Sequence, residues 1–296
     1  MASKTMAKFG HVLQDAKHIT ERISDAPKVS IEKFIGYTSV PVGLAGPLSI
    51  KSPDGTSTEI YAPIATTEYA IIANCSRGFS IATQNACDWL LGSTDDLELN
   101  ITGILIEGSM SPDRKPSWGS VSSPRGVEVV TWTSLPDGVC GAVLKCTAES
   151  LYHTFRTMQE GRIRNGQFGS NINAANVITG MFIATGQDVA SVSEGPWGHL
   201  TPEYDHESRQ LKLTVYFPSL PIGTVGGETT YGTQREALGI LGCIGPGMKS
   251  RLAGLIAAFS LALEISTAAS GANNTFTGSH EKLARGRQGK DKTSKV

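Results

Sequence analysis

The sequence predicts an α+β fold built around one dominant domain, and three observations support this prediction. Strand-like segments are spread between residues 48 and 217, apolar helix-like segments lie among them, and two further helices end the pattern. Strands and helices mixed without a regular βαβ order are typical of α+β domains. The 296 residues are enough for one large core, and we find no internal repeat.

The first half of the chain predicts a helical arm, paired strands and one long helix. The elements are a loosely held arm at 1–30, strands within 48–64, a helix from Thr66 or Thr67 to about Leu91, a connector with a short strand at 92–112, and two strands within 126–147. The turn residues Pro53-Asp54-Gly55 and Pro136-Asp137-Gly138 separate the members of each strand pair. The main domain is expected to span residues 31–285.

The second half predicts mostly helices. The elements are a helix at 148–161, a Gly/Asn loop at 166–173, a helix at 174–185, a strand at 210–217, a glycine-rich turn at 223–230, helices at 231–241 and 249–270, and a disordered basic tail at 286–296. The apolar run Leu252 to Ser270 is long enough for a membrane span. Glu264 and the many small residues in it favour a packed core helix instead.

Composition excludes several classes of protein. The net charge of −1 gives no basic surface for nucleic acid or for an anionic membrane. The five cysteines are odd in number and show no CxxC spacing, so neither a disulfide framework nor a zinc site is expected. The polar N-terminus lacks the apolar core of a signal peptide. A cytoplasmic protein without a bound metal is the resulting expectation.

Two carboxylates on predicted helices are candidates for chemistry. Glu68 lies in the first turn of one helix, and Asp188 follows the end of another in the sequence Gly186-Gln187-Asp188. The helix dipole disfavours an acid at a C-terminus, so Asp188 needs a donor or a cation beside it. The alternative is an ordinary terminal acid paired with a surface lysine.

Three further segments carry polar groups that could meet an anionic or carbonyl ligand. Asp113-Arg114-Lys115, with Pro116 after it, could bind a carboxylate or thioester oxygen or be a solvated turn. Gly223 to Thr230 could present free N–H groups to an anion, although it is not a GxGxxG motif. His280 could act as an acid or be a surface residue. The chain has no GxSxG, HExxH or P-loop motif.

Taken together, these segments resemble the HMG-CoA reductase family, in the family's order and over about residues 30–285. The matching segments are IGYTSVPVGLAGPL at 35–48, ATTE at 65–68, NVITGMFIATGQD at 176–188, PSLPIGTVGG at 218–227 and Ser279-His280. The resemblance implies the fold of the family's large substrate-binding domain. It also implies that Glu68, Asp188 and His280 are catalytic.

The departures from the family pattern suggest lost redox chemistry. The family's small dinucleotide-binding domain and its DAMGMN motif are missing, so no cofactor is expected. Arg114 stands at the position of the catalytic lysine, and Lys115 matches the next lysine. Tyr69, Asn173 and Glu228 also differ from the family and, with Asp113 and Asn176, are expected to bind the substrate.

The function expected from these departures is a repurposed, cofactor-independent enzyme of natural-product biosynthesis. A cyclase, isomerase or lyase acting on a terpenoid or polyketide fits, including a Diels–Alder-type pericyclase. The alternatives are a non-catalytic homologue, an NADPH-dependent HMG-CoA reductase, and hydrolysis or transfer of a CoA thioester. Arg114 or Lys115 should bridge Glu68 and Asp188. A homodimer with a small-molecule substrate is also expected, because the family's active site lies at a subunit interface.

Overall fold

The fold was analysed in a computed structural model, which describes residues 11, 13–21, 33–51, 57–65, 114–122 and 124–273. The expected helix 66–91, the connector 92–112 and the tail 286–296 lie outside these residues. The helices and strands of the main body are β3 (Val127–Pro136), α7 (Ala148–Arg164), α8 (Ala174–Thr185), β4 (His199–Asp205), β5 (Gln210–Leu220), α9 (Gly232–Ile240) and α10 (Lys249–Ala272). Together they confirm the α+β class.

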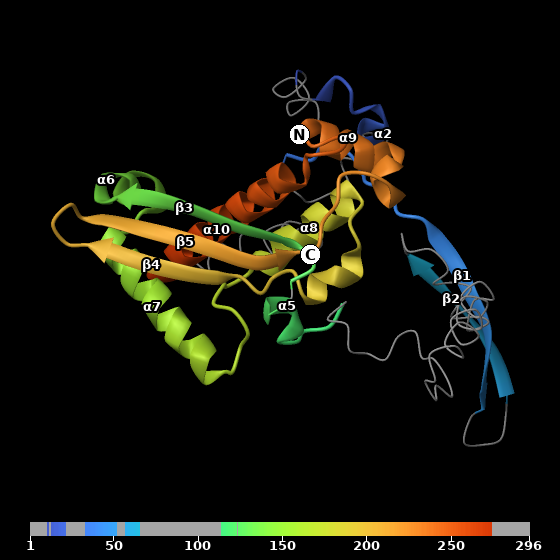
Figure 1. Ribbon diagram of the computed structural model, residues 1–296, viewed down its shortest axis with the longest axis horizontal. Helices are drawn as coiled ribbons and strands as arrows, with labels where there is room; N and C mark the ends of the chain where they lie inside the picture. The colour runs from blue at the N-terminus through green and yellow to red at the C-terminus, as the bar shows by residue number, and fades with distance from the viewer. Residues whose placement is uncertain are drawn as a thin grey trace, which may run out of the picture.

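A three-stranded antiparallel sheet with the order β3-β5-β4 forms the centre of the fold (Figure 1). Thr214 of β5 pairs with Trp132 of β3 and with Thr201 of β4, which fixes the register. Alternate residues of β5, from Leu211 to Phe217, are fully buried, as expected for a strand with one covered face. Helices α7 and α10 pack on that face, and α8 packs against α10 in the same continuous core.

The hairpin predicted within 48–64 is confirmed by strands β1 (Val42–Lys51) and β2 (Ser57–Ala65), which pair antiparallel. In Figure 1 the hairpin lies apart from the three-stranded sheet. The expected N-terminal arm includes the short helix α2 (Lys17–Thr20). Its described part is anchored rather than loosely held, because Glu236 of α9 accepts the backbone N–H groups of His18 and Ile19 at 2.9 Å each.

Two predictions about strands are wrong. Residues after Pro136 form the one-turn helix α6 (Asp137–Val139) and a short π-helix (Cys140–Leu144) instead of a second strand. The Asp137 carboxylate explains this, since it accepts the N–H of Ala148 at 2.8 Å and binds Arg209. Strand β4 was not predicted. It carries Pro202, which an edge strand tolerates because one side of its backbone needs no sheet partner.

Helix α10 is the long apolar segment, and it packs against α7, α8, β3 and β5. Among the described helices it alone is long and apolar enough to cross a membrane, and half of its most apolar window is buried inside the protein. This packing supports the predicted core helix. Glu264 of α10 is fully buried.

Glu264 joins α10 to the segment that begins α8. Its carboxylate accepts the backbone N–H groups of Ile172 at 2.6 Å and of Asn173 at 2.7 Å. Burial raises the pKa of Glu264 above its usual range, although these two hydrogen bonds and the nearby Arg162 guanidinium act in the opposite direction. The buried acid therefore satisfies donors at a helix start that nothing else in the core would satisfy.

We expect Glu264→Ala to lower the free energy of unfolding by about 2–4 kcal/mol, because two buried N–H groups lose their acceptor and a cavity opens. Glu264→Gln should cost less, since one amide oxygen still accepts. Urea unfolding followed by circular dichroism measures both values. Equal stability of Glu264→Ala and wild type would contradict the assigned role.

Candidate active site

Asp188 lies just beyond α8, where the chain turns sharply. Gly186 ends the helix with a φ of +70°, and a Cβ there would lie 2.7 Å from the backbone of Glu228. The Asp188 carboxylate then caps a following 3-10 helix (Val189–Ser193) by accepting the N–H of Ala190 at 3.0 Å. The acid therefore lies at the favourable N-terminal end of a new helical turn rather than against the C-terminus of α8.

The cation beside Asp188 is Arg114, one of the two residues predicted to bridge Glu68 and Asp188; the Glu68 half of that prediction lies outside the described residues. Arg114 Nε donates to Asp188 Oδ2 at 2.7 Å, and about a third of each side chain is exposed (36% and 34%). The alternative pairing with a surface lysine is therefore wrong. Arg114 has a φ of +55°, a conformation that non-glycine residues adopt only when their surroundings enforce it. Lys115, the next residue, is exposed.

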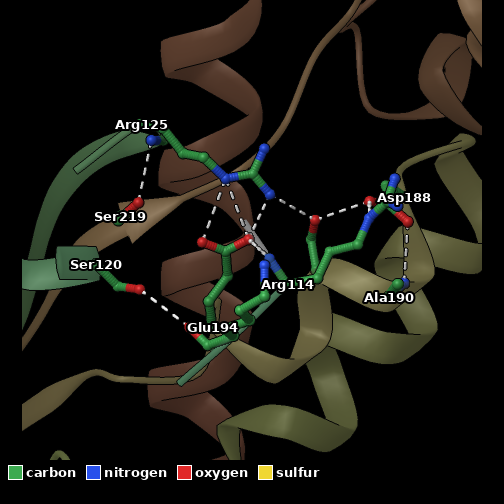
Figure 2. A network of polar contacts seen from close by, with 10 residues as sticks. Arg114, Ser120, Arg125, Asp188, Ala190, Glu194 and Ser219 are labelled. Atoms are coloured by element: carbon green, nitrogen blue, oxygen red, sulfur yellow. Dashed lines mark hydrogen bonds and ion pairs between the residues drawn. The ribbon is translucent and has the colours of Figure 1, made fainter. Parts of the chain in front are cut away.

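Three residues that the sequence analysis missed, Arg125, Ser191 and Glu194, extend the contacts around this pair, and Figure 2 shows Arg125 and Glu194 beside it. Glu194 has a fully buried side chain and forms an ion pair with Arg125. Arg125 Nη2 donates to Ser191 Oγ at 3.0 Å, and Ser191 Oγ donates to Asp188 Oδ2 at 3.0 Å. Arg125 and Glu194 are 69 positions apart, so no local spacing could have signalled their contact.

A hollow of about 350 Å³ opens beside Asp188. Its wall includes the predicted glycine turn, Arg125 and Glu228, so two carboxylates and one guanidinium line the same space. Gly226 and Gly227, with φ of +75° and +51°, shape this turn. The volume of the hollow is large enough for the reacting end of a small substrate.

Other predicted site residues lie elsewhere. Asn173 precedes the first residue of α8, about 18 Å along the axis from the Asp188 end of this 12-residue helix, and Asn176 lies in its first turn. The Asn173 amide donates to Thr267 Oγ1 at 2.7 Å, and its oxygen is buried without a hydrogen-bond partner. Glu68, Tyr69, Asp113 and His280 lie outside the described residues. Within the described part, no group of three or more His, Cys, Asp or Glu residues could hold a metal.

Sequence comparison with known proteins relates this chain to one enzyme family. The family profile described as hydroxymethylglutaryl-coenzyme A reductase matches residues 4–87 and 79–285. A relative from Methanocaldococcus jannaschii, named 3-hydroxy-3-methylglutaryl-coenzyme A reductase, is 26% identical over 91% of this chain and 89% of its own. A relative of the same name from Zea mays is 33% identical over 72% of this chain and 38% of its own.

The same comparison shows that this chain is shorter than its archaeal relatives within the matched region. The alignment with the Methanocaldococcus protein covers 362 positions, against 296 residues in the whole chain, so at least 66 positions have no residue here. The two matched pieces of the family profile meet at residues 79–87. This overlap lies inside the predicted helix that ends at about Leu91, and the loss of a dinucleotide-binding domain after that helix stays a prediction.

The expectation of a cofactor-independent cyclase, isomerase or lyase is wrong. Seven archaeal relatives that span most of the chain are all named as reductases, and none is named for a ring closure, isomerisation or elimination. The departures at Arg114 and Glu228 had suggested new chemistry, but a changed side chain does not by itself define a reaction. The alternative of a reductase agrees better with these relatives.

The left-handed backbone of Arg114 generates a prediction about stability. We expect Arg114→Gly to be more stable than Arg114→Ala by about 1 kcal/mol, because glycine adopts a positive φ without strain. Thermal unfolding of both variants measures the difference. A more stable alanine variant would show that residue 114 does not have this conformation in solution.

Proposed function

The chain belongs to the hydroxymethylglutaryl-coenzyme A reductase family, and we propose on that basis that it is a reductase of a hydroxymethylglutaryl-coenzyme A-type thioester. One observation carries the proposal. Asp188, which the resemblance implies is the family's catalytic aspartate, lies on the wall of a hollow of about 350 Å³, and its Oδ2 accepts the Nε–H of Arg114 at 2.7 Å.

The proposed role of Arg114 is to stabilise negative charge on the thioester oxygen. Reduction of a thioester carbonyl places negative charge on its oxygen, and a fixed cation lowers the energy of that state. Arginine keeps its proton at neutral pH, so Arg114 stabilises the charge without supplying a proton. Asp188 orients the guanidinium through Nε. A separate acid must then protonate the leaving thiolate, and the resemblance assigns that role to His280.

Glu228 is the second carboxylate that we assign to the substrate site. It is half-buried and lines the hollow with Asp188 and Arg125. A hydroxyl on the substrate could donate to its oxygen, whereas a substrate carboxylate placed against it would be repelled. We therefore propose that a cation, either Arg125 on the same wall or the exposed Lys115, meets the acidic end of the substrate.

The proposed reductase needs a hydride donor, and the donor that the family resemblance implies is a nicotinamide dinucleotide. Both described sheets are antiparallel, so they lack the parallel strand, glycine loop and helix that bind a dinucleotide pyrophosphate in a doubly wound fold. A hollow of about 350 Å³ also has room for only one end of such a molecule. NADPH consumption therefore has to be measured directly.

We expect Asp188→Asn to lower the rate of HMG-CoA-dependent NADPH oxidation roughly 100-fold, because the neutral amide no longer orients Arg114 by its charge. Asparagine caps a helix as well as aspartate does, so the fold should be kept. The control is Glu203→Gln, which breaks an exposed 3.4 Å pair with Lys212 on the sheet. Wild-type protein that binds HMG-CoA in calorimetry but never oxidises NADPH would refute the reductase.

A homodimer is proposed as the working form. Its support within this chain is the edge strand β3, where the large apolar side chains Val130 and Trp132 are 57% and 65% exposed and so are open to burial by a second copy. Light scattering at micromolar concentration should give twice the 31.3 kDa mass of one chain. A value of one chain mass would contradict the dimer.

A further inference from the structure

Glu194 does not line the hollow beside Asp188, yet both arginines of the site depend on it. Its side chain is fully buried, whereas about a third of the Arg125 side chain is exposed (38%). Arg125 donates from Nε to both Glu194 oxygens at 3.2 and 3.3 Å and from Nη2 to Oε1. Glu194 also accepts the backbone N–H of Arg114 at 3.1 Å.

These contacts close into a ring. From Glu194 the ring runs to the Arg114 backbone, from Arg114 Nε to Asp188, from Asp188 to Ser191, and from Ser191 through Arg125 back to Glu194 (Figure 2). Two acids and two arginines make its formal charge zero. Every link is a hydrogen bond to or from a charged side chain, and most such bonds are stronger than neutral ones.

The link between Glu194 and Arg114 holds the residue whose backbone is strained. A φ of +55° persists only where neighbouring groups favour it, and the hydrogen bond to a buried carboxylate supplies that constraint. If the backbone relaxed to a negative φ, the side chain would leave the loop in another direction. The guanidinium would then lose its 2.7 Å contact with Asp188.

We infer that Glu194 is a positioning residue, which fixes the backbone of Arg114 so that its guanidinium stays against Asp188 and is ready for the substrate oxygen. This inference rests on the proposed function for its consequence in turnover. Its structural part, the position of the Arg114 guanidinium, can be tested without any substrate. Glu194 itself touches no reacting atom, since its side chain is enclosed by the protein.

The first readout is the Nε–H signal of Arg114 in ¹⁵N NMR spectra, assigned by its disappearance in Arg114→Lys. In the wild type the hydrogen bond to Asp188 should slow the exchange of this proton with water. In Glu194→Gln the signal should shift and exchange rapidly, while in the control Glu203→Gln it should not change. An unchanged signal in folded Glu194→Gln overturns the inference, and this result does not depend on whether the protein is a reductase.

The second readout separates positioning from stability. Folded Glu194→Gln should lose roughly 10- to 100-fold in kcat, the effect of a lost hydrogen bond to a charged group, with little change in the KM for HMG-CoA. A residue that only stabilised the fold would lower the unfolding temperature and leave kcat unchanged. Unchanged kcat in the folded variant would therefore overturn the inference, whereas a wild type without turnover would refute only the proposed reductase.

Glu194→Gln leaves Arg125 without its charged partner and could prevent folding. The double variant Glu194→Gln/Arg125→Gln removes one charge of each sign and avoids this problem. It should fold, and its Arg114 Nε–H signal should still be altered. A wild-type Arg114 Nε–H signal in the double variant would show that Glu194 serves only to neutralise Arg125, which overturns the inference.

Discussion

The buried carboxylate of Glu264 is the interaction on which the arrangement of the site depends. It accepts two backbone N–H groups just before α8 and lies on α10, the longest helix of the core. Burying a charged acceptor in an apolar core costs free energy unless its hydrogen bonds are complete. Displacing either helix would break these bonds, so the carboxylate keeps the two helices in place. Once α8 is fixed at this end, its far end places Asp188 beside the sheet and the glycine turn.

At that far end, opposite charges balance within a small region. Asp188 and Glu194 face Arg114 and Arg125, and Ser191 joins the two ion pairs through one hydroxyl. Glu194 is buried, whereas the other three charged side chains are partly exposed. The buried acid therefore fixes the geometry, and Asp188 and Arg125 are left on the wall of the hollow, where a substrate can meet them.

Family membership supports a reductase, whereas the length of the chain shows that part of what its relatives contain is missing here. The curated relatives are named reductases, yet at least 66 aligned positions of one of them have no residue here. The resemblance implies that Arg114 stands at the position of the family's catalytic lysine, and an arginine there is limited to electrostatic stabilisation, because it does not release a proton near neutral pH. The substrate site and the binding of a hydride donor are therefore separate questions for this chain, and binding and turnover measurements answer them separately.

Local sequence patterns determined the parts of this protein that depend on near neighbours. The hairpin within 48–64, the helix bounds 174–185 and the core helix at 249–270 follow from turn residues, apolar spacing and small-residue content. The sequence placed Asp188 directly after a helix, but its argument from the dipole of that helix does not hold, because Asp188 caps the start of the next helical turn. The sequence did not predict β4, because Pro202 and its charged neighbours are tolerable only at a sheet edge. Nor did it predict Arg125 with Glu194, or Glu264 with Asn173, because these partners lie 69 and 91 positions apart. Only the tertiary structure decided those pairs, since a buried charge takes its partner from whatever the fold brings within hydrogen-bond distance.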